Sequence, residues 1–390
     1  MKGTFKAEVT VIKVRVLMTG GGTGGHVNPA IAIADVIRAN QPDAQIEFVG
    51  TSRGIENKLV PKAGYRLHHV EVQGFKRKLT PYNIKSAWLA FTSPIKAKKL
   101  IKQFAPDLVI GTGGYVCWPL LKAAASMGVP TAVHESNAIP GVAVKMLARF
   151  VDRIYVNFDA TAKALGESYS DKVAKVGNPI KPEFSSIDAA AVRKELGLGE
   201  KYKHLLLSYG GSMGAEKVND EMLAFMRDYT KHHPELLHIP ATGAIEHEAA
   251  TAKSKEYGLA DCENIRICEY IYNMPELMAA ADIVVSRAGA MTLSELAALE
   301  KCCILIPSPH VADNHQYKNA KVLADKDAAL LFEEKELVGD KLTKALSELI
   351  ADAEKRKKMC ENISAFALVD ANRSIYFDLC SLAKANAGKK

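Results

Sequence analysis

A run of glycines near the start of the sequence separates a stretch typical of a strand from a pattern typical of a helix. Residues 20–26 read Gly-Gly-Gly-Thr-Gly-Gly-His, after the largely apolar residues 14–18 and before a helical pattern that follows Pro29. Backbone amides at a helix N-terminus attract phosphate, because four N–H groups lack partners there and the helix dipole is positive at that end. His26 adds a side chain that moves protons near neutral pH. The loop therefore predicts a diphosphate site beside a candidate base.

The same alternation of strand-like and helical patterns continues along the chain. A break with two prolines, Pro179 and Pro182, suits a stiff linker, and 390 residues are too many for one ordinary core. Such alternation is typical of parallel sheets with helices on both faces, so we predict an α/β protein with two doubly wound, Rossmann-like domains. Strands are predicted at 15–19, 45–50, 108–111, 131–134, 153–156 and 173–176, and then at 204–208, 236–240, 265–268, 283–286, 303–306 and 329–332.

The linker sets the predicted domain boundaries. Residues 1–13 are expected to form a short N-terminal extension, because they lack the apolar core of a signal peptide. The first domain is predicted over 14–177 and the second over 178–363. Residues 364–390 are expected to be mostly helical and to pack on either half, with a return to the N-terminal domain as one option.

The spacing Gly20-x-Gly22-x-x-Gly25 also matches the dinucleotide-binding fingerprint. That fold needs an acidic residue at the end of the second strand to hold a ribose. Here the second strand ends at Gly50 without a carboxylate, and Glu47 is expected to point elsewhere. A nicotinamide dehydrogenase is therefore disfavoured, and a plain tight turn is the other alternative.

Three further loops follow predicted strands. Residues 111–115 can converge with the first loop on one anion, or form an ordinary turn. Residues 210–215 open the second half and add the Ser212 hydroxyl. In residues 286–296, Thr292 and Ser294 can cap a helix or donate to phosphate, and Glu295 can accept from ribose hydroxyls or only complement the helix dipole. Anion sites in both halves suit an enzyme that joins two diphosphate-bearing substrates.

Other polar groups carry weaker signals. His134 ends a predicted strand and is as compatible with a structural role as with a catalytic one. Asp325-Lys326-Asp327 mimics a metal-binding pair, but its charged surroundings predict solvated surface, so no metal site is predicted. The seven cysteines are scattered without a Cys-x-x-Cys pair, which is typical of reduced thiols in the cytosol.

Residues 72–106 contain eight cations and no acidic residue, with aromatic side chains interleaved. Nucleic-acid binding is not predicted, because no nucleic-acid motif accompanies the stretch. A solvated face does not explain Trp88 and Phe91 among the lysines. We favour attachment to an anionic lipid surface, where cations are attracted and aromatic rings insert. The residues assigned to membrane association are Phe75, Lys76, Arg77, Lys78, Lys85, Trp88, Phe91 and Trp118.

Taken in order, these motifs resemble the MurG family of N-acetylglucosaminyltransferases, which convert lipid I to lipid II in peptidoglycan synthesis. The resemblance runs from about residue 14 to the C-terminus, and seven motifs in register make it specific. They are residues 21–27, 113–115, 134–137, 177–179, 210–215, 286–295 and 316–320.

The resemblance implies a GT-B fold with two domains facing across a cleft. It implies an inverting, metal-independent transfer without a cofactor, from UDP-N-acetylglucosamine to the 4-hydroxyl of N-acetylmuramic acid in lipid I, with His26 as candidate base. The implied donor-binding residues are Thr23, Gly24, Gly25, Asn137, Lys181, Ser212, Ile271, Ala290, Met291, Thr292, Leu293, Ser294, Glu295 and Gln316. The implied residues for the acceptor diphosphate are Gly22, Gly24, Gly25, Gly113, Gly114 and Tyr115.

Within the implied donor site, Ile271 bonds uracil through its backbone, Glu295 holds the ribose hydroxyls, and Gln316 contacts the N-acetylglucosamine hydroxyls. Lys181 stands where the family usually has arginine, which keeps the charge but loses the bidentate fork. Met213 and His315 replace frequent glutamines. A diacylglycerol glycosyltransferase of the same fold and a non-catalytic nucleotide-sugar-binding scaffold remain as alternatives.

The resemblance also implies a location and partners. The protein is expected at the cytoplasmic face of the bacterial inner membrane, as a peripheral protein. Its partners are expected to be UDP-N-acetylglucosamine, lipid I and the anionic membrane surface, with other cell-wall synthesis proteins as a further option.

Overall fold

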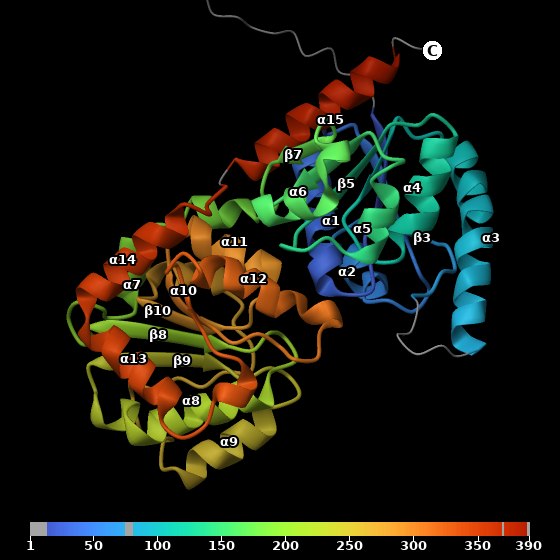
Figure 1. Ribbon diagram of the computed structural model, residues 1–390. Coiled ribbons are helices and arrows are strands. Elements are labelled where there is room, and N and C mark those ends of the chain that lie inside the picture. Colours follow the sequence, from blue (N-terminus) through green and yellow to red (C-terminus); the bar gives the residue numbers. More distant parts are fainter. Residues whose placement is uncertain (1–13, 75–80, 369, 388–390) are drawn as a thin grey trace, which may run out of the picture. The chain divides into compact units, whose positions relative to one another are not determined.

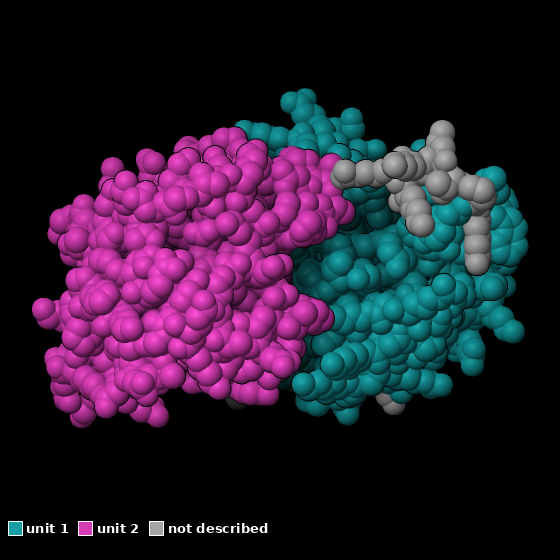
Figure 2. All heavy atoms as spheres, turned by 90° about the horizontal axis from the view of Figure 1, so that it is seen from below, with its two compact units in different colours: residues 1–136, 140–179, 370–390 teal, residues 137–139, 180–369 magenta. Residues whose placement is uncertain are grey.

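The computed structural model describes residues 14–74, 81–368 and 370–387. The chain divides into two compact units, coloured separately in Figure 2. Unit 1 comprises the chain up to Ser136, Pro140–Pro179 and the segment from Asp370 onward. Unit 2 comprises Asn137–Ile139 and the chain from Ile180 to the start of that C-terminal segment. The predicted extension over 1–13 lies outside the described residues.

Unit 1 contains a seven-stranded parallel sheet in the order β3-β2-β1-β4-β5-β6-β7. Strand β3 was not expected from the sequence, because three of its four residues are Arg or His. Its backbone nevertheless pairs with β2 along its whole length. The strands are β1 (Arg15–Thr19), β2 (Gln45–Gly50), β3 (Arg66–His69), β4 (Leu108–Gly111), β5 (Thr131–Glu135), β6 (Arg153–Val156) and β7 (Val173–Lys175).

Successive side chains of a strand point to opposite faces of a sheet, so the apolar run in β1 supplies two cores. Val16 and Met18 pack with α1 (Gly24–Asn40), α2 (Glu56–Lys62) and α15 (Ala371–Ala387). Leu17 joins the core formed with α3 (Pro81–Phe104), α4 (Cys117–Ser126) and α5 (Val142–Leu147). Helix α6 (Asp159–Leu165) adds partly buried residues to this second core.

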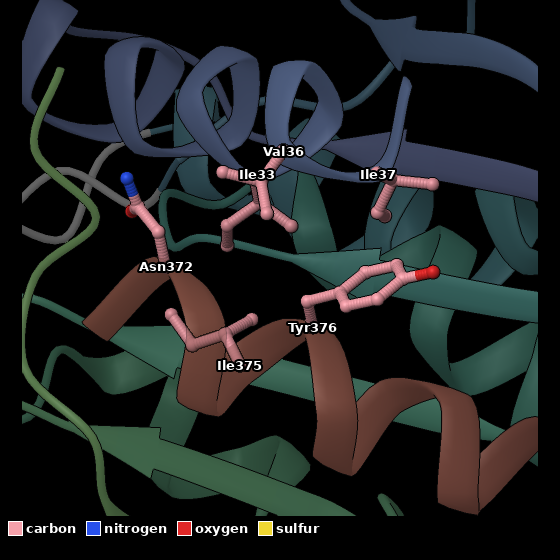
Figure 3. Close-up of a pocket in the computed structure, with 6 residues that line it drawn as sticks. All are labelled: Ile33, Val36, Ile37, Asn372, Ile375 and Tyr376. Carbon is pink, nitrogen blue, oxygen red and sulfur yellow. The ribbon is translucent and has the colours of Figure 1, made fainter. Parts of the chain in front are cut away.

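The C-terminal helix α15 packs on α1 of unit 1 (Figure 3). Ile33 and Ile37 of α1 face Ile375 and Tyr376 across this seam. Asp378 accepts hydrogen bonds from the Tyr155 hydroxyl (2.7 Å) and from Nε of Arg153 (3.1 Å). Within residues 364–390, which were expected to be mostly helical, α15 covers Ala371–Ala387, and the preceding helix α14 ends at Ser364.

Unit 2 contains a five-stranded parallel sheet in the order β12-β11-β10-β8-β9. Figure 1 shows its strands β10, β8 and β9 side by side. The strands are β8 (His204–Tyr209), β9 (Leu236–Ala241), β10 (Ile283–Ser286), β11 (Cys302–Leu305) and β12 (Leu330–Leu331). The helices are α7 (Ala189–Glu195), α8 (Glu216–Asp228), α9 (His247–Glu256), α10 (Met274–Ala280), α11 (Ala290–Ala298), α12 (His315–Ala324), α13 (Lys341–Ala351) and α14 (Ala353–Ser364).

The prediction of a full strand over 265–268 is wrong. This segment runs beside the edge strand β9 but makes only isolated bridges, His238 with Ile265 and Ala241 with Cys268. Two residues of β9 lie between these bridges, Ile239 and Pro240, and the Pro240 carbonyl accepts from the amide of Cys268. Proline has no N–H to return the next ladder bond, so the pairing is interrupted there.

The strand order in each sheet reverses once, which creates a topological switch point where ligands of such folds bind. In unit 1 the reversal lies between β1 and β4, and in unit 2 between β8 and β10. All four strands are followed by the loops that the sequence singles out: residues 20–26 and 111–115 in unit 1, and 210–215 and 286–296 in unit 2. The topology therefore gathers the motifs in pairs.

A fully buried histidine in unit 2 gives a prediction about stability. His238 on β9 shares a 3.0 Å hydrogen bond with the Ser208 hydroxyl, and burial lowers its pKa to about 3. In the unfolded chain this histidine binds a proton near pH 6.5, whereas in the folded chain it stays neutral until the pH is near 3. The free energy of unfolding is therefore highest above pH 6.5 and decreases as the pH falls toward 3. We expect a loss of ~1.4 kcal/mol per pH unit over this range.

Urea unfolding between pH 7 and 4 tests this expectation. His238→Gln keeps an amide near Ser208 but does not titrate, so its stability should fall less steeply with acid than that of the parent. His232→Gln, at an exposed position of the same unit, should follow the parent curve. Parallel curves for the parent and His238→Gln would contradict the assignment.

Candidate active site

The two glycine loops of unit 1 meet around His26. Thr112 makes two bonds to this residue: its carbonyl oxygen lies 3.2 Å from Nδ1 of the ring, and its hydroxyl donates to the His26 carbonyl at 2.6 Å. A carbonyl oxygen only accepts, so Nδ1 carries the proton and Nε2 is the basic nitrogen of the neutral ring. The partly exposed ring is thereby fixed in one orientation.

Gly113 is required by this packing. A Cβ at Gly113 would lie 2.6 Å from Nδ1 of His26, and its φ of +102° strains any other residue. The loop over 111–115 therefore packs against the first loop at His26, and the convergence of both loops on one anion stays a prediction. Tyr115, at the end of the second loop, is 38% exposed and packs over Gly22.

The first loop ends at the open N-terminus of α1. Thr23 is the extended N-cap, and the first turn reads Gly-Gly-His-Val, with no side-chain cap among the described residues. The amides of His26 and Val27 donate to the Thr23 carbonyl, which leaves those of Gly24 and Gly25 as the helix's own unsatisfied donors. An anion placed there would also meet the positive end of the helix dipole.

The amide of Gly22, in contrast, is already engaged. It donates to Oε2 of Glu56 at 3.2 Å. Glu56 is a fully buried carboxylate in the first turn of α2, and the sequence analysis did not single it out. The expected role of Gly22 in binding the acceptor diphosphate is therefore not supported by its amide, which binds a carboxylate of the protein itself.

In unit 2, the third glycine loop is braced by the loop that follows β9. The amides of Ala244 and Ile245 donate to the carbonyls of Ser212 (3.1 Å) and Met213 (3.2 Å). Gly214 has a φ of +92°, and a Cβ at this position would lie only 2.3 Å from the carbonyl oxygen of Thr242. The Ser212 side chain itself is exposed, next to the start of α8. It is thus placed to donate to an anion.

The second loop of unit 2 leads into α11, whose N-cap is Gly289. The hydroxyl of Ser294 donates back to the Ala290 carbonyl (3.3 Å), so capping by Ser294 does not occur. Glu295 is the sixth residue of the helix and lies beyond its first turn. Because dipole effects fade within the first turn, complementing the dipole is a poor account of Glu295.

Burial shapes the chemistry of Glu295. Part of the residue remains open to solvent, but protein surrounds its carboxyl, and this burial raises its pKa to about 7. The positive charge of Lys181 opposes the rise. A carboxyl poised between its two protonation states at a switch point is a candidate for binding hydroxyl groups of a ligand.

Asn319, which the sequence analysis did not assign a role, fixes the position of Asn137. The side chain of Asn319 is fully buried on α12. Its oxygen accepts from the Ala138 amide (2.8 Å), and its nitrogen donates to the oxygen of Asn137 (3.1 Å). These bonds explain why Asn137–Ile139 belongs to unit 2. On the same helix, Gln316 accepts from the Ser308 amide at 2.9 Å, which orients its amide group.

Three other features named from the sequence can also be placed in the structure. His134 is fully buried, and its Nε2 lies 2.8 Å from the Gly177 carbonyl, so the structure favours its structural alternative. Asp325, Lys326 and Asp327 are exposed, and the described part of the chain contains no cluster of three or more His, Cys, Asp or Glu able to hold a metal. Ile271 is buried, whereas its neighbours in the sequence, Tyr270 and Tyr272, are exposed and their rings meet edge to face.

Helix α3 carries an exposed apolar stripe. Ile84, Trp88, Phe91 and Ile95 are 62–81% exposed and follow a helical spacing. Trp118 is only partly exposed and donates its indole N–H to the Ala90 carbonyl (3.1 Å), so it packs α4 on α3 and lies outside the stripe. Phe75, Lys76, Arg77 and Lys78, and the side chain of Lys85, lie outside the described residues.

No helix among the described residues is both long and apolar enough to cross a membrane.

Two doubly wound units, each with glycine loops at its switch point, form a GT-B fold, and the family matches identify the chain as a glycosyltransferase. The glycosyltransferase family 28 N-terminal domain matches residues 16–156, and the corresponding C-terminal domain matches residues 205–374. The chain belongs to the MurG family within this group, as its relatives and a solved structure show.

Two relatives carry the same name, UDP-N-acetylglucosamine–N-acetylmuramyl-(pentapeptide) pyrophosphoryl-undecaprenol N-acetylglucosamine transferase. The protein from Thermoanaerobacter sp. strain X514 is 42% identical over 93% of this chain and 98% of the relative. The one from Acetivibrio thermocellus is 41% identical over 93% and 96%. The crystal structure of Acinetobacter baumannii MurG matches with a TM-score of 0.75, at 25% identity over 94% of this chain and 99% of that chain.

Proposed function

We propose that this glycosyltransferase moves N-acetylglucosamine from UDP-N-acetylglucosamine to the 4-hydroxyl of N-acetylmuramic acid in lipid I, giving lipid II. The names of the relatives support both substrates. The observation that carries the proposal is the pairing of motifs at two switch points. The switch point of unit 1 has the open N-terminus of α1 and the oriented ring of His26. The switch point of unit 2 has the loop with the Ser212 hydroxyl and the buried carboxyl of Glu295.

The donor belongs to the switch point of unit 2 in this proposal. Glu295 accepts the ribose hydroxyls, the backbone of Ile271 bonds uracil, and Ser212 and residues 290–294 receive the diphosphate. Gln316 contacts the sugar hydroxyls, and Asn137, with Thr23, Gly24 and Gly25 of unit 1, faces the sugar. Lys181 adds positive charge near Glu295. Helix N-termini stabilise the departing UDP, so no metal is required.

The acceptor belongs to the switch point of unit 1. Its diphosphate is received by the amides of Gly24 and Gly25 and by the loop with Gly113, Gly114 and Tyr115. Nε2 of His26 removes the proton of the attacking hydroxyl as that oxygen displaces UDP from the anomeric carbon. A single displacement of this kind inverts the anomeric configuration.

An assay of UDP release with a lipid I analogue tests the proposal, and we expect release only when the analogue is present. Equal turnover with diacylglycerol would point to the alternative lipid glycosyltransferase. Binding of UDP-N-acetylglucosamine without release in any mixture would point to the scaffold. The same assay with EDTA tests the metal: unchanged turnover is expected, and a loss restored by Mg²⁺ would contradict the metal-free part.

We further propose that α3 attaches the protein to the cytoplasmic face of the bacterial inner membrane, where lipid I is presented. Trp88 and Phe91 would insert at the interface, while Lys96, Lys98, Lys99 and Lys102 meet anionic headgroups. Each of these cations contributes about 1 kcal/mol near such a surface. Other cell-wall synthesis proteins are further expected partners, and nucleic acid is not.

A double replacement of Trp88 and Phe91 by serine should weaken binding to vesicles with anionic lipid by about 10- to 100-fold, because two exposed aromatic rings no longer leave water. Sedimentation with phosphatidylglycerol vesicles measures this. Phe377→Ser removes an aromatic ring that is 55% exposed on α15 and should bind like the parent. Raising salt should also release the parent protein. Binding that ignores both changes would contradict the proposal.

A further inference from the structure

The carboxylate of Glu56 contacts the glycine loop of unit 1 that leads to His26. Glu56 is fully buried, and its Oε1 accepts from the amide (2.9 Å) and hydroxyl (2.8 Å) of Thr51. Its Oε2 accepts from the amide of Gly22 at 3.2 Å. Although burial opposes ionisation, these bonds from Thr51 and Gly22 and one from its own amide hold its pKa below the ordinary value. The group is therefore a permanent negative charge inside the fold.

Three glycines form a cage around this carboxylate. A Cβ would lie 2.9 Å from the Glu56 carboxyl at Gly21, 2.6 Å from its side chain at Gly50, and 2.0 Å from Oε2 at Gly54. None of these three has a positive φ in the structure, so close approach to the carboxylate accounts for the absence of a side chain. Glycine at these three positions thus leaves room for the carboxylate of Glu56.

The bonds of Glu56 link loops that follow different strands. Gly22 belongs to the loop after β1, and Thr51 directly follows β2. Tyr115, from the loop after β4, packs over Gly22, and the Glu56 charge adds to burial in raising the pKa of its phenol. A buried charge is costly unless fully hydrogen-bonded. Glu56 stands where these loops meet, and an apolar side chain there could not accept hydrogen bonds. Its presence therefore indicates that the loops are held together by hydrogen bonds to the carboxylate oxygens.

We propose that Glu56 is a positioning residue for the acceptor: it occupies the Gly22 amide as an internal anion and holds the loop that presents Gly24, Gly25 and His26. Its fixed charge keeps the lipid diphosphate away from Gly22 and directs it to the start of α1. This role rests on the proposed function, since it names the place of the acceptor within the same site.

Glu56→Gln tests the link to Gly22 separately from the link to Thr51. The amide oxygen of glutamine is expected to face Thr51, which offers two donors, so its NH₂ group meets the N–H of Gly22 and that bond is lost. We expect kcat/KM for the lipid I analogue to fall about 10- to 100-fold, because a polar group is left unpaired. The dissociation constant of UDP, which lacks the sugar, should stay within about twofold, since the proposed ribose and diphosphate contacts lie in unit 2.

Two further variants frame the result. Glu47→Gln alters a carboxylate on β2 that pairs with His68, and this variant should retain the parent kinetics. Thr51→Val removes a single hydroxyl donor and should act in the same direction as Glu56→Gln but less strongly, which keeps the test valid if the glutamine variant does not fold.

The backbone amide of Gly22 gives a readout that does not depend on activity. In ¹⁵N spectra its signal should shift, and its hydrogen exchange should accelerate, in Glu56→Gln but not in Glu47→Gln. If the parent lacks transferase activity but these changes appear, the positioning of the loop stands and the proposed function fails. An unchanged Gly22 amide, or an equal loss of affinity for UDP and for the acceptor, would overturn the positioning role.

Discussion

Replacing His26 by alanine should lower kcat with the lipid I analogue by about 10²–10⁴-fold, the usual cost of removing a general base. The geometry gives the reason. The bond from Nδ1 to the Thr112 carbonyl sets the tautomer, so Nε2 carries the lone pair that takes the proton. The KM for UDP-N-acetylglucosamine should change little, because the groups proposed for the nucleotide lie in unit 2. Steady-state kinetics with each substrate varied in turn measures this split.

Loss of the base must be separated from loss of packing, because the ring also fills space against Gly113. Added imidazole should restore part of the turnover of His26→Ala, since it supplies a base without repairing the loops. His68→Ala, on β3 of the same sheet, should retain turnover. A variant at His26 with near-normal kcat would remove it from the mechanism.

Much of the fold could be predicted because strand, loop and helix follow one another with clear periodicity. The missed strand β3 and the mistaken strand over 265–268 show where periodicity fails. At Arg66–His69, pairing with β2 overrides polar composition, and beside Pro240 a missing N–H overrides apolar composition. In both cases the neighbouring strand determines whether the segment forms a strand, and the local sequence pattern contains no information about that neighbour.

The site shows the same limit. His26 and Glu295 lie in motifs that can be recognised from spacing alone. Glu56 and Asn319 act through contacts with residues far from them in the chain, Gly22 in one case and Asn137 in the other. The only local hint for Glu56 is Gly50 and Gly54 close before it, whose meaning depends on where the carboxylate lies.

Binding of UDP-N-acetylglucosamine should weaken as the solution becomes more acidic, because of Glu295. The ionised carboxylate accepts both ribose hydroxyls, whereas the protonated form keeps fewer acceptor sites. With a pKa of about 7 in the free protein, the group is mostly ionised at pH 8 and mostly protonated at pH 6. Affinity that follows the ionised fraction falls by up to about tenfold over this range.

Variants at three positions assign this pH dependence. Glu295→Gln should bind the donor about 10- to 100-fold more weakly, as expected for losing bonds to a charged acceptor, and without a change between pH 6 and 8. Lys181→Ala removes the positive charge that opposes the raised pKa, so its profile should move toward higher pH. Glu300→Gln, just beyond the end of α11, should follow the parent. Calorimetric titration with UDP-N-acetylglucosamine measures each profile, and a flat parent profile would separate Glu295 from the ribose.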